Sequence, residues 1–453
     1  MRHKIRLSSL YNRLIFFLLF YCAIQDFFIP VVYKVIGSSA IANFLFYQKD
    51  VLLIVLFAWS LKRVSDKILR IGSLIYLMLV FVLLMLSAIG AFSVDTSLTS
   101  LLSNTRMVIL LPCLVCIGSA IKDRDGFLET LRNKWFPFIV FMAIIGLIEY
   151  ALDFLVGTKS YWTDTIGYTN YYVEIKKQAS HMLFGLPGNF YGNYGNGYFS
   201  SKRLVGLWAN PLTSAYSLLP CGIYYFIKAA KVFEKKKIER ADISNFIRFL
   251  IVFLAIYFTH TRAILISLLL IIAIYIFTNV RRSPGLLVIM IVGGLGIVFA
   301  LDFNEIQRFM VDGSTLAHIG AVTQTMNNLR ISLFGHGIGS LGVGASLTTE
   351  SSYLTLLGNV GIIGTLLYLI IYLRGMKLAK YSQESDIGKL IRYCSFVYLI
   401  TGLISEQLFA YTSIAQFFVL LGLSAQMSKA VAREMVIQDI RSDISYGMNV
   451  VRR

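Results

Sequence analysis

The stretch Ile71–Phe92, IGSLIYLMLVFVLLMLSAIGAF, contains no Asp, Glu, Lys or Arg over its whole length. About 20 consecutive apolar residues in a helix rise about 30 Å, which is the thickness of the hydrocarbon core of a bilayer. This stretch therefore predicts a helix that crosses a membrane, and similar stretches recur along the chain.

The overall composition agrees with that prediction. Of the 453 residues, 57% are hydrophobic and only 15% are charged, and the mean hydropathy is +0.70. Soluble domains carry about 25% charged residues, so an ordinary cytosolic or secreted enzyme is excluded. The five cysteines lie in apolar stretches, and we expect them, including the Cys-x-x-Cys pair Cys113 and Cys116, to pack rather than to form disulfides or bind metal.

We expect an all-α, polytopic integral membrane protein with about 12 transmembrane helices, in which residues 1–453 form a single membrane domain. With the amino terminus in the cytoplasm, most of the 42 Lys and Arg residues fall in cytoplasmic connections, as the positive-inside rule requires. Both termini are then cytoplasmic, and residues 429–453 form a cytoplasmic tail. The predicted spans are residues 14–33, 41–61, 71–92, 104–121, 135–156, 206–228, 246–260, 263–279, 285–301, 352–373, 390–410 and 411–428.

The formal charge of +18 is explained by this topology and by attraction to anionic lipid of the inner leaflet. Nucleic acid is therefore not an expected partner, whereas the lipid bilayer is. The basic residues before the first span suggest a signal peptide, but no small-x-small cleavage site follows, so a retained anchor is expected.

Two long connections, residues 157–205 and 302–351, are predicted to be large extracytoplasmic loops. The first is rich in aromatic residues and contains the run GNFYGNYGNGYF over residues 188–199. Its tyrosines suit either an interfacial aromatic belt beside a flexible loop or the flat faces of sugars.

Polar side chains gather on the outer side of the predicted bundle. Within Phe258-Thr-His-Thr-Arg262, the chain turns at the tip of a tight helical hairpin, so Arg262 would stand at a helix amino-terminal end. There its guanidinium and the free backbone N–H groups would meet one anion together. The alternative is an interfacial arginine that reaches the phospholipid headgroups.

Two further segments complete this polar set. Arg203-Leu-Val-Gly-Leu-Trp-Ala-Asn-Pro211 closes the first large loop, with Asn210 as a helix N-cap and Pro211 in the first turn. Arg330-Ile-Ser-Leu-Phe-Gly-His-Gly-Ile-Gly-Ser340 precedes Glu350-Ser-Ser-Tyr-Leu. The glycines around His336 permit close backbone approach, either to a bulky ligand or simply to make turns.

In this order and spacing, the segments resemble the superfamily of bacterial O-antigen polymerases and O-antigen ligases. The resemblance rests on Arg-x-x-Gly…Asn-Pro at 203–211, Thr-x-Thr-Arg at 259–262, Phe-Gly-His-Gly-Ile-Gly-Ser at 334–340 and Ser-Tyr-Leu…Gly-Ile-Ile-Gly at 352–364. It implies a GT-C-like membrane glycosyltransferase of the bacterial inner membrane that uses undecaprenyl-pyrophosphate-linked oligosaccharides on the extracytoplasmic face.

The choice between polymerase and ligase follows from a difference between this chain and the ligases. Ligases of this superfamily resemble one another in a His-rich stretch just before the span that begins here near Ser352, whereas this chain has Thr348-Thr-Glu-Ser-Ser352. We therefore expect a polymerase of lipid-linked repeat units for O-antigen or another surface polysaccharide. A ligase that transfers glycan to the lipid A core is the alternative. A possible chain-length regulator protein is a partner implied by the resemblance.

The expected mechanism needs no metal and no cofactor. The resemblance implies that Arg203 and Arg262, with Arg330 and His260, bind the pyrophosphate of the donor, because guanidinium groups stabilise charge that grows on a leaving group. Glu350 or His336 would orient or deprotonate the acceptor hydroxyl. A rival of another class is a secondary transporter or lipid-glycan flippase, although the chain shows no internal repeat of the kind common in transporters.

Overall fold

A computed structural model describes residues 2–65, 71–91, 98–156, 160–177, 182–183, 185–191, 202–231, 239–279, 313–341, 349, 351–382, 385–403, 405 and 411–427. Helices dominate these residues, and one two-stranded antiparallel sheet pairs β1 (Met182–Leu183) with β2 (Leu186–Pro187). The expected all-α class is therefore confirmed for the described part of the chain.

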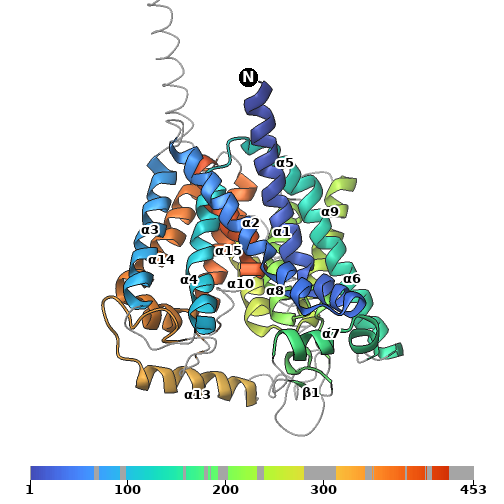
Figure 1. Ribbon diagram of the computed structural model, residues 1–453. Helices are drawn as coiled ribbons and strands as arrows, with labels where there is room; N and C mark the ends of the chain where they lie inside the picture. The colour runs from blue at the N-terminus through green and yellow to red at the C-terminus, as the bar shows by residue number, and fades with distance from the viewer. Residues whose placement is uncertain are drawn as a thin grey trace, which may run out of the picture.

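Long helices run side by side in a bundle, and the amino terminus lies at the end opposite to α13 (Figure 1). The major helices are α1 (Arg2–Ile36), α2 (Ser39–Ser65), α3 (Ile71–Ala91), α4 (Leu98–Ser119), α6 (Phe136–Val156), α8 (Pro211–Ala230), α9 (Arg240–Phe258), α10 (Arg262–Asn279), α13 (Gly313–Asn328), α14 (Ser352–Lys380), α15 (Ser385–Thr401) and α16 (Tyr411–Met427). We call the end that carries α13 the α13 face, and the opposite end, which carries α5 (Arg124–Thr130), the α5 face.

Among the described residues, five helical segments are long and apolar enough to cross a membrane. They are Ser9–Ile36, Ser39–Arg63, Arg124–Leu152, Arg240–Phe258 and Ser352–Lys380, and shorter apolar helices cover Leu74–Leu86, Val108–Ser119, Arg262–Tyr275 and Thr412–Met427. The membrane character of the chain therefore rests on helices as well as on composition.

A helix overlaps every predicted span except 285–301, which lies outside the described residues, as does the predicted tail 429–453. Several boundaries were wrong. The span predicted at 135–156 belongs to a helical segment that begins at Arg124 and passes through the π-helical turn η1 (Leu131–Trp135). The span predicted at 246–260 begins at Arg240, and the one predicted at 390–410 ends at Thr401.

Helix α16 lies against α4 in the centre of the bundle, where glycines allow the two backbones to touch. A Cβ atom at Gly118 of α4 would overlap the carbonyl of Val419, and one at Gly422 of α16 would overlap the carbonyl of Val115. Small residues permit such close helix contacts inside membranes, where packing rather than water drives association.

The described residues of the first large loop form a packed unit. Trp162, Tyr168, Tyr171 and Phe190 are buried in a second core, where the indole of Trp162 meets the rings of Tyr168 and Phe190 edge-on. The unit comprises η2 (Ser160–Thr165), α7 (Tyr168–Asn170), η3 (Tyr171–Ile175), the small sheet and η5 (Gly188–Phe190). The interpretation of these buried rings as an interfacial belt or as exposed sugar platforms was therefore wrong.

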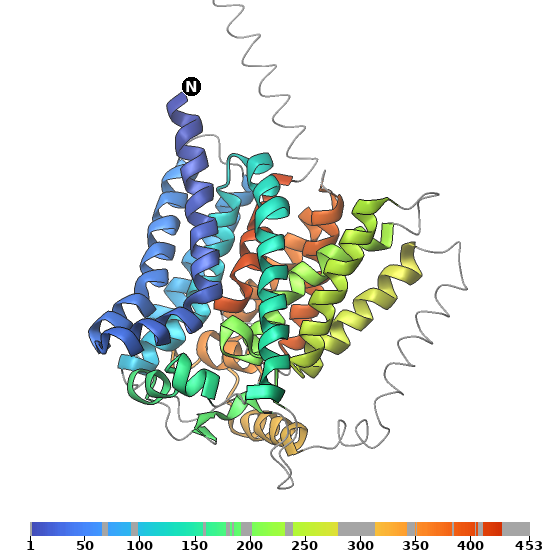
Figure 2. The same cartoon turned by 90° about the vertical axis from the view of Figure 1, so that its right-hand side faces the viewer.

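This unit is fastened to the end of α1. The ammonium of Lys176 pairs with Asp26 at 3.2 Å, and Lys34 and Tyr33 of α1 donate to the carbonyl of Asp164 and to Glu174. The described part of the first large loop therefore lies at the α13 face beside the end of α1 (Figure 2).

Helix α14 is interrupted at Gly361, whose φ of 69° and ψ of −169° are far from helical. Helices that cross membranes tolerate a break only where other groups satisfy the freed backbone. Here the preceding segment does so, since the N–H groups of Ile362 and Ile363 donate to the carbonyls of Ser332 and Leu333 at 3.1 Å each. The N–H of His336 donates to the carbonyl of Gly358 at 2.7 Å.

The side chain of Asn359 completes this contact. Its Oδ1 accepts from the N–H of Gly339 at 2.7 Å, and its Nδ2 donates to the carbonyl of Leu341 at 2.9 Å. We call residues 332–341, which bind the broken helix in this way, the clasp. A Cβ atom at Gly335 would lie 2.6 Å from the carbonyl oxygen of Asn359, so the clasp tolerates only glycine there.

We predict that Gly361→Ala lowers stability strongly. Its backbone conformation alone costs a non-glycine residue about 1–3 kcal/mol, and the new methyl group would overlap the backbone of Gly335. Thermal unfolding in detergent measures the effect. Gly320→Ala on α13 is the matched control, because a Cβ there meets nothing within 4 Å, and an equal loss in both variants would contradict the role of the break.

Candidate functional site

The hairpin tip has the predicted form. Helix α9 ends at Phe258, and α10 begins at Arg262, so this arginine does stand at the amino-terminal end of a helix. Between them His260 adopts a φ of 50°, a left-handed conformation that is uncommon outside glycine. The turn is held from within, since Thr259 Oγ1 donates to the carbonyl of Ile256 at 2.6 Å.

Arg203 binds this tip from the side. Its Nε donates to the carbonyl of Thr259 at 2.8 Å, and its guanidinium nitrogen Nη2 donates to Thr261 Oγ1 at 3.2 Å. The backbone next to it is also tied down, because the N–H of Leu204 donates to the carbonyl of Phe258 at 2.8 Å. Arg203 therefore grips the two residues that flank His260.

The start of α8 adjoins the same tip. Asn210 Oδ1 accepts from the N–H groups of Leu212 at 2.9 Å and Thr213 at 3.2 Å, which confirms Asn210 as the N-cap with Pro211 in the first turn. Thr261 Oγ1 lies 3.4 Å from the carbonyl of Pro211. Two helix amino-terminal ends thus meet beside Arg203, and both favour anions. We call Arg203, His260 and Arg262 with these helix ends the tip cluster.

The two arginines act on one imidazole. The ring of His260 keeps contact with solvent, yet partial desolvation and then the charges of Arg203 and Arg262 lower the pKa of His260 from its ordinary value of 6.5 to about 4. His260 is therefore neutral at pH 7 and capable of donating or accepting a hydrogen bond there. The cluster carries positive charge from its guanidinium groups alone.

We predict a pH dependence that depends on His260. Because the folded-state pKa is below that of the unfolded chain, the unfolded state takes up the proton first as pH falls from about 6.5 to about 4, and stability falls over that window. Thermal midpoints measured between pH 7 and pH 4 should fall less in His260→Gln than in the wild type. Equal slopes in the two proteins would show that the pKa of His260 is not depressed in the folded protein.

A buried ion pair is formed by Lys202, the residue that precedes Arg203 of the tip cluster. Lys202 Nζ lies 2.6 Å from Glu149 Oε1 of α6, and both side chains are 8% exposed. Glu149 also accepts from the indole of Trp162 at 2.9 Å and from the N–H of Gly206 at 3.2 Å. Glu149 and Lys202 are 53 residues apart in the chain, so the sequence alone does not single out this pair.

We predict that Glu149→Ala costs about 3–5 kcal/mol, because it leaves the ammonium of Lys202 buried without its carboxylate. Asp164→Ala on the first large loop is the control, since the bond that Lys34 makes to Asp164 goes to its backbone carbonyl, which the substitution keeps. Thermal unfolding distinguishes the two. The double variant Glu149→Ala/Lys202→Ala should recover part of the loss, and no recovery would argue against the ion pair as the cause.

The other candidates are arranged differently. The ring of His336 contacts the carbonyl of Arg330 through Nε2, and the backbone of His336 is bonded to α14 within the clasp. The close approach that the glycines allow is therefore to the chain's own helix. The side chain of Arg330 is exposed, and Glu350 lies outside the described residues.

The contacts divide the candidates into two groups on the α13 face. Arg203, His260 and Arg262 share the hairpin tip, whereas His336 belongs to the clasp and contacts the carbonyl of Arg330, just before it. Asp123 lies outside both groups and caps α5 by accepting from the N–H of Gly126 at 3.1 Å. Within the described residues, no group of three or more His, Cys, Asp or Glu side chains is placed to hold a metal ion.

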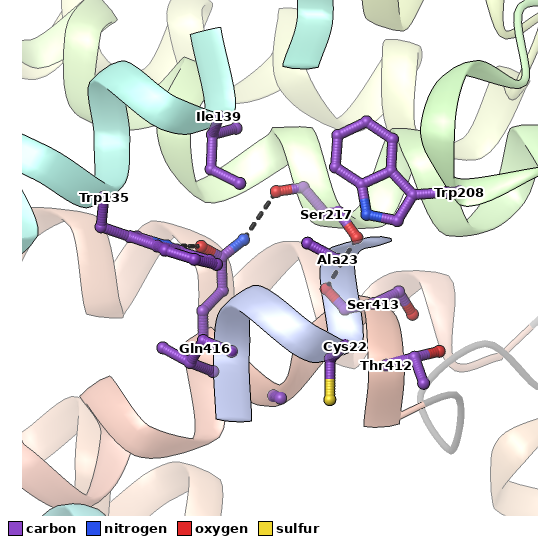
Figure 3. A pocket seen from close by; sticks show the side chains of 11 residues that line it. Cys22, Ala23, Trp135, Ile139, Trp208, Ser217, Thr412, Ser413 and Gln416 are labelled. Atoms are coloured by element: carbon purple, nitrogen blue, oxygen red, sulfur yellow. Dashed lines mark hydrogen bonds between the residues drawn. The ribbon is translucent and has the colours of Figure 1, made fainter. Parts of the chain in front are cut away.

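A small cavity lies deeper in the bundle, between α1, α6, α8 and α16 (Figure 3). A chain of hydrogen bonds crosses it: the indole of Trp135 donates to Gln416 Oε1 at 2.7 Å, and Gln416 Nε2 donates to the carbonyl of Ser217 at 2.6 Å. Trp208 lines it from η6 (Gly206–Trp208), within the Arg203–Pro211 segment. None of the charged side chains of the tip cluster lines this cavity.

Comparison with known proteins adds no family to this geometry: no family model and no curated protein matches the chain.

Proposed function

We propose that the protein is a polymerase of undecaprenyl-pyrophosphate-linked oligosaccharide repeat units, for O-antigen or another surface polysaccharide. It would be a bacterial inner-membrane protein with about 12 spans and both termini in the cytoplasm. Glycosyl transfer would then take place on the α13 face, outside the cytoplasm, without metal. The observation that carries the proposal is the tip cluster, where two guanidinium groups and two helix amino-terminal ends meet around His260.

The leaving group explains why such a cluster is needed. The acceptor hydroxyl attacks C1 of the donor sugar, the C1–O bond breaks, and its electron pair stays on the pyrophosphate oxygen. Arginine presents fixed, planar donors that remain charged at all accessible pH values. In this proposal, Arg262 and the amino-terminal end of α10 stabilise the departing pyrophosphate, while Arg203 both contributes charge and holds the tip in place.

The proton of the acceptor hydroxyl needs a base, and His336 and Glu350 remain the two candidates. The contact of His336 with a carbonyl supports a defined tautomer. A carbonyl only accepts, so this contact favours the neutral tautomer whose N–H is on Nε2. The clasp would fix the position of the imidazole through the backbone bond to Gly358.

The decisive experiment incubates purified protein with synthetic lipid-pyrophosphate repeat units and no metal. A ladder of lengthening lipid-linked glycans supports the polymerase. Transfer only to a lipid A core would indicate the ligase instead. Substrate that crosses vesicles unchanged would indicate a transporter or flippase.

We predict that Arg262→Gln slows laddering by about 10²–10³-fold, the usual cost of removing one donor that stabilises developing negative charge. Arg203→Gln should do the same and also lower the thermal midpoint, because its bonds to Thr259 and Thr261 are lost. Lys177→Gln, an exposed change on the first large loop, is the control. Wild-type ladders from Arg262→Gln would remove that arginine from the reaction.

A further inference from the structure

A second group of cations lies on the α5 face, far along the helices from the tip cluster. Lys228 and Lys231 stand at the end of α8, Arg248 lies on α9, and Arg132 lies in η1. The hydroxyl of Tyr224 is within electrostatic range of both Arg132 and Arg248. Three separate elements thus direct cationic side chains to one place around Tyr224.

The two lysines of this group share one carboxylate. Asp386 at the start of α15 lies 2.8 Å from Lys228 Nζ and 2.6 Å from Lys231 Nζ. Burial favours its neutral form, but the hydrogen bonds from these two lysines keep the pKa of Asp386 below its ordinary value, so it is ionised at pH 7. The group contains four cationic side chains and this one carboxylate, so its formal net charge is positive. A positive charge favours the binding of an anion.

Aromatic rings hold two of the cations at the edge of the apolar region. The guanidinium of Arg248 lies 5.5 Å from the ring centre of Tyr225 and 3.5 Å from its hydroxyl, and Lys228 Nζ lies 5.8 Å from the ring centre of Tyr224. Tyrosine and arginine in this arrangement are typical of the headgroup region of a membrane.

An apolar strip begins beside Arg248. Only 22% of the most apolar window of α9 is buried within the protein, so most of this helix faces its surroundings. The neighbouring helix α6 also exposes large apolar side chains. The exposed residues of the two helices are Ile243, Phe246, Ile247, Leu250 and Leu254 of α9, and Phe141, Ile144 and Ile148 of α6.

We propose that Arg132, Lys228, Lys231 and Arg248 bind the phosphate headgroup of an anionic phospholipid whose acyl chains lie along α9. The cations match the charge of the headgroup, and the apolar strip next to them distinguishes a lipid from a free phosphate ion. Basic pockets between membrane helices bind acidic lipid headgroups in this way. The inference does not depend on the polymerase reaction, because the lipid is neither its donor nor its acceptor.

The test uses purified full-length protein, with lipid binding measured by native mass spectrometry and by the shift of the thermal midpoint on addition of vesicles. Vesicles contain either phosphatidylglycerol or phosphatidylcholine. We expect a saturable shift with phosphatidylglycerol that is absent with phosphatidylcholine and is not reproduced by inorganic phosphate. An equal shift with inorganic phosphate would indicate a free-anion site and overturn the lipid.

Matched double variants locate the site. Arg132→Gln/Arg248→Gln removes two charges from the group, and we expect its affinity for phosphatidylglycerol to fall about thirtyfold. Lys134→Gln/Arg240→Gln removes two exposed charges from the same elements, and it should bind like the wild type. Equal losses in the two double variants would overturn the site. If the first variant does not fold, Arg248→Gln alone is compared with Arg240→Gln.

Discussion

The guanidinium of Arg203 bonds to the residues on both sides of His260, and the arrangement of the α13 face depends on this interaction. Arg203 belongs to the segment that follows the first large loop, whereas Thr259 and Thr261 belong to the hairpin of α9 and α10. One side chain therefore joins parts of the chain that are remote in sequence. It also brings two helix amino-terminal ends together, and it does so with a group that cannot lose its charge. A lysine would reach the tip but could not bond to both flanking residues in one plane.

Backbone satisfaction governs the second feature of this face. A break in a membrane helix frees N–H and carbonyl groups, and each unsatisfied group in lipid costs several kcal/mol. The clasp supplies the missing partners through main-chain bonds at Ile362 and Ile363 and through both ends of the Asn359 amide. Glycine is required because the two backbones touch, and the same requirement explains the glycine-rich sequence without a ligand. The imidazole of His336 is carried into a fixed place by the same contact.

Much of the fold could be predicted from the sequence because its strongest signal is local. Uninterrupted apolar stretches coincide with helices, as Ile71–Ala91 does, and the N-cap at Asn210 and the helix start at Arg262 follow from short motifs. The break at Gly361 could not be predicted in this way, since glycine is common within membrane helices. The helix is interrupted at Gly361 because the backbone there contacts Gly335, and the sequence around neither glycine predicts that contact.

The candidate site shows the same division. The hairpin tip is local, so Arg262 and His260 were found together. The bond from Arg203 to the tip and the ion pair between Lys202 and Glu149 join residues that are far apart in the sequence. Lys202 and Arg203 are adjacent basic residues with different partners, and only the tertiary structure shows which partner each one has. The burial of the aromatic rings in the first large loop could not be predicted for a related reason. A tyrosine in a loop has the same sequence signature whether it faces sugar, lipid or a second core.

The depressed pKa of His260 links this electrostatic arrangement to a chemical consequence. Burial, and then the two guanidinium groups nearby, make protonation of this imidazole unfavourable, so the tip cluster does not gain a third positive charge at neutral pH. An anion bound there would cancel part of that repulsion and raise the pKa of His260. The imidazole would then be able to share a proton with the bound anion, which a third arginine could not do. In the proposed reaction, the pyrophosphate gains negative charge as it leaves the sugar. Such a site would suit it, because His260 can take up a proton in response to that charge while the two arginines keep theirs.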